Sequence, residues 1–282
     1  MKNYINLLTN LIFYLLIFIG IFRFTDKELK FLLNFLNESN KIYIFLILFL
    51  KVLMVYTSVA QHKILYEEFN LNLTNFENLK LIINSMMGNF FSFAKHGSIY
   101  KAKYLNQNFS FKYKSFVKFF LVLNILSIAL NFLIIFMYFL WKNSIFYFIL
   151  TLSIIGILSF FYKNKISKIY SLKVNSFIKL FLLQIISLTF YCIALYYLSK
   201  AIGLNLNFLQ IIIFSIIVSL SILISITPNS IGIREFLLLL VSSSLIISRN
   251  EIILLSLLDR LTDALFLILF FLIVNILKIK NK

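Results

Sequence analysis

The chain has 282 residues, of which 61% are hydrophobic and 13% are charged, with 27 Lys and Arg against 10 Asp and Glu. A soluble domain carries about 25% charged and about 45–50% apolar residues, so this composition excludes a water-soluble globular domain and predicts an integral membrane protein. The net charge of +17 does not indicate nucleic-acid binding, because the basic residues lie at the ends of apolar segments, where the positive-inside rule and anionic lipid headgroups account for them.

Apolar segments of roughly 20 residues recur along the chain, and a helix of that length crosses about 30 Å of hydrocarbon. They are apolar on all sides, which favours α-helices over the alternating strands of a β-barrel. The clear segments are residues 4–22, 42–60, 119–141, 145–162, 177–198, 208–227 and 252–277. Residues 81–94 are more polar and are expected to re-enter the membrane or lie at its interface, whereas residues 236–248 span it if they are tilted or packed within protein. The pattern predicts an all-α polytopic bundle of about seven or eight transmembrane helices, one or two of them re-entrant or broken.

The loops between these segments predict the orientation. With eight crossings and a cytoplasmic amino terminus, 18 of the 27 basic residues fall on the inner side and seven on the outer side. The positive-inside rule therefore favours a multi-pass protein with both termini in the cytoplasm. The first segment lacks a small-residue cleavage site and is expected to remain as an uncleaved helix. The longest polar stretch, residues 61–80, is too short to fold alone, so residues 1–282 are expected to form a single membrane domain.

A polar break is predicted where two of the six glycines, Gly88 and Gly97, bracket a stretch that contains Asn89. Lys95 and Lys101 add positive charge near the expected membrane surface, and a lysine ammonium is a compact point charge suited to phosphate. One hypothesis is a re-entrant hairpin whose basic end contacts a phospholipid headgroup or a polyprenyl phosphate. The alternative is that these lysines only follow the positive-inside rule.

The single proline, Pro228, together with Gly232 predicts a second helix break, between two apolar segments. Proline lacks a backbone donor, and glycine permits a positive φ. Broken backbone at membrane depth is tolerated only where it is buried in protein or lines a wet cavity, and such breaks often present a helix N-terminus to an anionic group. The alternative is an ordinary tight turn between two spans at the cytoplasmic surface.

Three ionisable residues, Asp259, Arg260 and Asp263, lie about a third of the way into the last apolar segment. Asp259 and Asp263 share a helical face. An ionisable side chain at this depth costs several kcal/mol if it faces lipid, so it must pair or face water. The expected pairs are Glu235 with Arg260, and Arg234 with Asp259 or Asp263. The competing interpretation is an ion-pair network that only holds two helices together.

No metal site or cofactor is expected. His62 and His96 lie beside lysines in predicted loops, and the single cysteine, Cys192, lies in an apolar segment without a ligand cluster. The sequence also lacks a P-loop, a G-x-S-x-G elbow and an HExxH motif. An ATP-driven pump is therefore not expected unless a partner supplies the ATPase.

Two blocks of residues resemble the lysylphosphatidylglycerol synthase transmembrane-region family. Pro228-Asn-Ser-Ile-Gly-Ile-Arg-Glu235, followed by Leu258-Asp-Arg260, resembles its C-terminal signature, which is a proline, a Gly-x-x-Glu and a downstream arginine. Asn89 and the stretch Gly97-Ser-Ile-Tyr-Lys-Ala102 resemble its N-terminal block, in which Lys101 stands where an arginine is usual. The similarity lies in residues 53–116 and 205–275.

The resemblance implies a bacterial or archaeal inner-membrane protein. In this family the domain moves aminoacylated phosphatidylglycerol between leaflets, and stand-alone members are linked to the export of lipids or polyprenyl-linked sugars. Members that make the lysyl-lipid carry a separate soluble synthase domain. The chain ends at Lys282 without one, so by resemblance it is expected to keep the translocation-like part and to lack the transferase part.

The leading hypothesis is a flippase-like protein of the bacterial inner membrane that translocates or handles an anionic or aminoacylated phospholipid or a polyprenyl-linked lipid. Its expected partner is membrane lipid, with a lipid-modifying enzyme or glycosyltransferase as a further candidate, and its oligomeric state is not predicted. Two alternatives stay open: an integral-membrane transferase or hydrolase acting on lipid-linked phosphate, and a non-catalytic scaffold for a lipid-modifying enzyme. The predicted substrate-binding or translocation residues are Asn89, Lys95, Lys101, Arg234, Glu235, Asp259, Arg260 and Asp263.

Overall fold

A computed structural model of the chain describes residues 41–92, 95–143, 173–224, 227–245 and 247–279. All regular structure in these residues is helical, which confirms the predicted all-α class for this part of the chain. The elements are α3 (Lys41–Glu68), α4 (Asn75–Phe91), α5 (His96–Phe109), α6 (Tyr113–Asn143), α8 (Val174–Ala201), α9 (Phe208–Ile224), the short 3-10 helix η1 (Pro228–Ser230), α10 (Ile233–Leu245) and α11 (Arg249–Ile279). The predicted segments 4–22 and 145–162 lie outside the described residues.

Three of the described helices are long and apolar enough to cross a membrane: Lys41–Glu68, the part Tyr113–Ile134 of α6, and Val174–Ala201. Their outer faces are strongly apolar, as Phe45, Phe132 and Ile178 show, each with more than half of its surface exposed. An apolar face of this kind requires hydrocarbon around it, because a protein in water would cover it. The chain is therefore an integral membrane protein.

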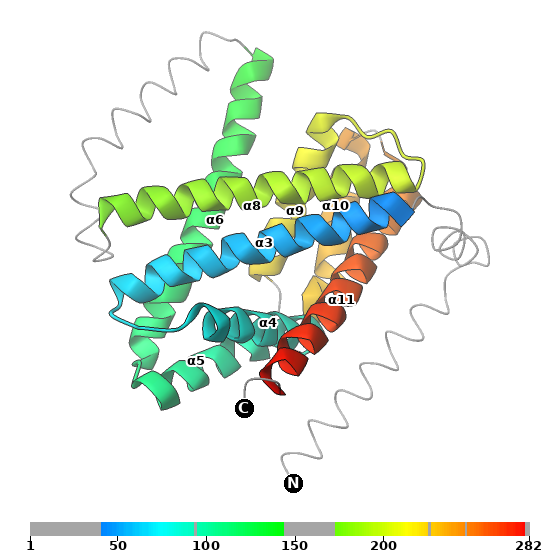
Figure 1. The fold of residues 1–282 in the computed structure, drawn as a ribbon. Helices are drawn as coiled ribbons and strands as arrows, with labels where there is room; N and C mark the ends of the chain where they lie inside the picture. Colours follow the sequence, from blue (N-terminus) through cyan, green and yellow to red (C-terminus); the bar gives the residue numbers. More distant parts are fainter. Residues whose placement is uncertain (1–40, 93–94, 144–172, 225–226, 246, 280–282) are drawn as a thin grey trace.

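The helices pack around a long antiparallel pair. Figure 1 shows α3 and α8 side by side, with the start of α3 beside the end of α8. Helix α11 packs against α3, α4, α8 and α10, and α9 packs against α8 and α10. The apolar cluster where these helices meet includes Ile47, Leu195, Phe214, Leu238 and Leu255, all buried. This packing fixes the parts of α3, α8, α10 and α11 that carry the ionisable residues.

Helices α4 and α5 pack against each other beneath this pair (Figure 1). Helix α4 begins at a capping box, in which Thr74 and Glu77 satisfy each other's backbone N–H groups. The prediction that Gly88 breaks a helix is wrong, because α4 continues through it to Phe91. Gly97 lies in the first turn of α5. A Cβ on Gly88 would lie 2.7 Å from the Cα of Gly97, so the two glycines let the helices approach closely.

His62 is also not in a loop, contrary to the expectation from the sequence, because α3 continues past it to Glu68. The apolar face of α3 extends through this last part, where Leu65 and Tyr66 are fully buried. His62 therefore lies inside the helical bundle, and its ring is 5.3 Å from that of Phe119 on α6.

Candidate functional site

The predicted break between α9 and α10 is present. Pro228 begins η1, and the backbone then passes through left-handed conformations at Asn229, Ser230 and Gly232. The positive φ of +85° at Gly232 is one that side-chain-bearing residues rarely adopt, which explains the glycine. Helix α10 begins directly afterwards at Ile233.

Side chains from other segments satisfy the backbone carbonyl groups that this break leaves without helical partners. The Ser230 hydroxyl donates to Ser221 O at 3.0 Å, and the Lys95 ammonium donates to Leu223 O at 3.0 Å, so two carbonyls in the last turn of α9 are bonded. Arg260 donates to Ser230 O at 3.2 Å. The break is therefore held by partners from both α11 and the start of α5.

The Glu235 carboxylate lies at the start of α10 and faces α11. It accepts hydrogen bonds from the Gly232 N–H at 2.9 Å and from the Ser256 hydroxyl at 2.8 Å. Two nitrogens of Arg260 approach it, at 2.8 and 3.0 Å, so the ion pair is two-pronged. The predicted Glu235–Arg260 pair is present, and it joins the break to α11.

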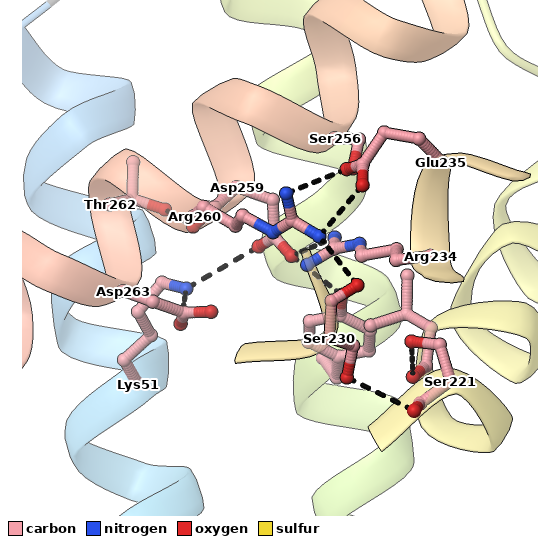
Figure 2. Close-up of polar contacts among 12 residues, drawn as sticks. Lys51, Ser221, Ser230, Arg234, Glu235, Ser256, Asp259, Arg260, Thr262 and Asp263 are labelled. Atoms are coloured by element: carbon pink, nitrogen blue, oxygen red, sulfur yellow. Dashed lines mark hydrogen bonds and ion pairs between the residues drawn. The ribbon is translucent and has the colours of Figure 1, made fainter. Parts of the chain in front are cut away.

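A second group of ion pairs centres on Asp259. Its carboxylate contacts Arg234 at 2.5 Å on one side and Lys51 at 3.5 Å on the other, and Figure 2 shows both cations facing it. The predicted Arg234–Asp259 pair is therefore present. Asp263 instead pairs with Lys51, so this lysine lies between two carboxylates. Tyr191 on α8 donates a further hydrogen bond to Asp259 at 2.8 Å.

We refer to the six ionisable residues Lys51, Arg234, Glu235, Asp259, Arg260 and Asp263 as the charged centre. Three cations face three carboxylates, so the formal charge is balanced. Arg234 is 1% exposed and Asp259 is 2% exposed, whereas the Asp263 side chain is 32% exposed. The charged centre is thus closed around Asp259 and open at Asp263.

Lys51 and Tyr191 were not predicted as parts of the site. Lys51 could have been predicted from the sequence, because it is an ionisable residue in the middle of an apolar segment, and such residues normally need a partner of opposite charge. Tyr191 could not, because a single uncharged tyrosine inside an apolar segment does not by itself indicate a site. Only the packing of α3 and α8 against α11 brings these two side chains to Asp259.

The predicted site residues of the first break lie outside the charged centre. Asn89 caps the start of α5, because its side-chain oxygen Oδ1 accepts a hydrogen bond from the Ser98 N–H at 3.1 Å. Lys95 bonds the end of α9, as described above. Lys101 points into a buried aromatic cluster, over the rings of Tyr66 and Phe119. Helix α4 contacts both η1 and α11, so the two predicted breaks do lie close together.

The contact of Lys95 gives a direct prediction. Lys95→Met removes the donor to Leu223 O and leaves a carbonyl of α9 without its partner, so we expect a loss of about 1–2 kcal/mol of stability. Unfolding of the purified protein in mixed micelles measures it, with Lys103→Met, an exposed lysine on α5, as the control. Equal stability of the two variants would contradict a capping role for Lys95.

The fold and the charged centre define the class: a helical integral membrane protein with a broken helix held by buried ion pairs. The model of the lysylphosphatidylglycerol synthase transmembrane-region family matches residues 8–270. The chain therefore belongs to this family, as the resemblance of its sequence blocks implied. No curated protein and no solved structure matches the chain.

Proposed function

We propose that the protein translocates or handles an anionic or aminoacylated phospholipid or a polyprenyl-linked lipid, and that the charged centre is where the headgroup binds. The observation that carries this proposal is the charged centre itself: six ionisable side chains, gathered from α3, α10 and α11 of a membrane protein, with one carboxylate accessible. Ionisable groups at membrane depth are costly and commonly mark a substrate or ion pathway. Membership of a family tied to lipid handling supports the same conclusion.

The arrangement of the ion pairs suits the binding of a charged headgroup. Lys51 contacts both Asp259 and Asp263, so it can shift onto Asp259 and release Asp263 without becoming unpaired. A cationic headgroup would then bind Asp263, and an anionic one would bind Lys51. The Nε atoms of Arg234 and Arg260 are buried and have no acceptor among the described residues, so they are further donors for headgroup oxygens.

The remaining parts of the proposal follow from the sequence. Charge in the loops favours an inner-membrane protein with both termini in the cytoplasm. The driving force is a substrate gradient or ion coupling through the carboxylates. A lipid-modifying enzyme or a glycosyltransferase is the partner that would supply or consume the lipid.

Asp263→Asn tests the proposal with the least damage to the fold, because Lys51 keeps Asp259 as its counterion. We expect leaflet exchange of a fluorescent anionic or aminoacylated phospholipid in sealed proteoliposomes to slow by about tenfold or more, which corresponds to about 1.4 kcal/mol in the barrier. Glu235→Gln is expected to act in the same direction. Glu251→Gln is the matched control, because it changes a carboxylate to an amide on the same helix outside the charged centre.

Three outcomes separate the competing functions. Movement that is lost in Asp263→Asn and kept in Glu251→Gln supports translocation through the charged centre. Chemical turnover of a lipid-linked phosphate in detergent, where no leaflets exist, would favour an integral-membrane enzyme. Unchanged movement in folded Asp263→Asn and Glu235→Gln would leave the charged centre as a scaffold that holds helices together.

A further inference from the structure

Lys101 is a buried lysine outside the charged centre. It lies on α5 and is 5% exposed, and its ammonium is 5.9 Å from the ring centre of Tyr66 and 5.3 Å from that of Phe119. The ion pairs and hydrogen bonds of the described residues do not include its ammonium. Aromatic faces offset part of the cost of burying a cation, but a buried ammonium without a counterion remains costly.

Two other polar groups share this cluster. The Tyr66 hydroxyl is buried and has no hydrogen-bond partner in the described part of the chain. The His62 ring lies 6.1 Å from the Tyr66 ring, and its Nδ1 is 2.7 Å from Ser58 O, which makes Nδ1 the donor. In the neutral ring Nε2 is then an acceptor, so His62 is a neighbour of this cluster and not a donor to an anion.

The character of these groups identifies the ligand class. An ammonium only donates, and the Tyr66 hydroxyl is able to donate as well, so a ligand that suits both is rich in acceptor atoms. A phosphate-type oxyanion is rich in acceptor atoms, and its negative charge would neutralise the ammonium of Lys101. Helix α5 is not one of the spanning helices, and burial lowers the pKa of Lys101 to about 7. Near neutral pH the ammonium form is therefore readily available to an arriving anion.

We infer that Lys101 and Tyr66 form a binding site for a phosphate-type oxyanion, separate from the charged centre. The inference rests on the proposed function only for the source of the ligand, which would be a lipid phosphate. Inorganic phosphate presents the same chemistry.

The test is a thermal titration of the full-length protein in neutral detergent. The probes are inorganic phosphate, a short-chain phosphatidylglycerol and the diacylglycerol with the same chains, which lacks the phosphate. The variants are Lys101→Met and Tyr66→Phe, and Lys103→Met is the matched control because it removes an exposed lysine from the same helix. Neither test variant should lower the basal Tm by much, because each removes a buried polar group without a hydrogen-bond partner among the described residues.

We expect phosphatidylglycerol to raise the Tm of the wild type saturably and diacylglycerol to leave it unchanged. Lys101→Met should weaken the affinity about ten- to a hundredfold, Tyr66→Phe by a smaller factor, and Lys103→Met not at all. A response to inorganic phosphate alone, lost in Lys101→Met, would support the site with a soluble ligand. Equal responses of Lys101→Met and Lys103→Met, or no difference between the phosphate probes and diacylglycerol, would overturn the inference.

The same titration separates this inference from the proposed function. Asp263→Asn leaves Lys101 and Tyr66 in place, so it should keep the part of the response to phosphatidylglycerol that Lys101→Met removes, even where leaflet exchange is lost. A protein that binds phosphate at Lys101 and moves no lipid would overturn translocation and leave the oxyanion site standing.

Discussion

Asp259→Asn is expected to destabilise the protein by about 3–5 kcal/mol, the range typical of breaking a buried ion pair from one side. The carboxylate of Asp259 is the counterion of Arg234, which is 1% exposed, and it shares Lys51 with Asp263. An asparagine of the same shape keeps the packing but leaves the Arg234 charge buried without an anion. Unfolding in lipid–detergent micelles measures the loss.

The matched experiment removes both charges together. In the double variant Asp259→Asn with Arg234→Met, no unpaired guanidinium is left, so part of the stability should return and the two substitutions should be strongly non-additive. Additive losses, or an Asp259→Asn protein as stable as the wild type, would show that Arg234 does not depend on this carboxylate.

Gly97→Ala is expected to have the second large effect, about 3 kcal/mol, at the upper end of what overpacking usually costs. A Cβ at Gly97 would lie 1.8 Å from Ser85 O and 2.8 Å from Asn89 N, both backbone atoms of α4 that cannot rotate away. Helices α4 and α5 must therefore move apart, which also disturbs the cap that Asn89 forms with Ser98. Thermal unfolding of the purified variant gives the size of the effect.

Gly203→Ala is the control for Gly97→Ala. Gly203 has a φ of +74°, but none of the described atoms lies within 4 Å of the place that a Cβ would take, so the cost there is limited to backbone strain of about 1–2 kcal/mol. If Gly97→Ala costs no more than Gly203→Ala, close packing of α4 on α5 is not what the glycine provides.

Much of the fold could be predicted because it depends on local patterns. Apolar length fixed the positions of α3, α6, α8 and α11, and the proline with its following glycine located the break before α10. The pairs of Arg234 with Asp259 and of Glu235 with Arg260 followed from the need to neutralise ionisable groups at membrane depth. These are strong constraints that act on any membrane helix.

The errors and omissions concern contacts between distant segments. Lys51 and Asp259 are 208 positions apart, and nothing in their spacing says that α3 packs on α11. The polar stretch that Gly88 and Gly97 bracket predicts a break at Gly88, but a helix keeps a glycine where close packing on its neighbour needs a small residue. The charge of Lys95 suggested a contact with lipid, and only the fold shows Leu223 O beside it.

The hydrogen bond from Arg260 to the break has a consequence for the insertion of the protein into the membrane. Arg260 follows Ser230 by 30 positions, so it leaves the ribosome after the break has already emerged. Until α11 is in place, the Ser230 carbonyl has to be hydrogen-bonded by water or by the insertion machinery, because a backbone carbonyl without a partner is costly in lipid. Closure of the break is thus a late step of membrane assembly, and a chain that stops before α11 should be recognised as unfinished by the cell's quality-control proteases.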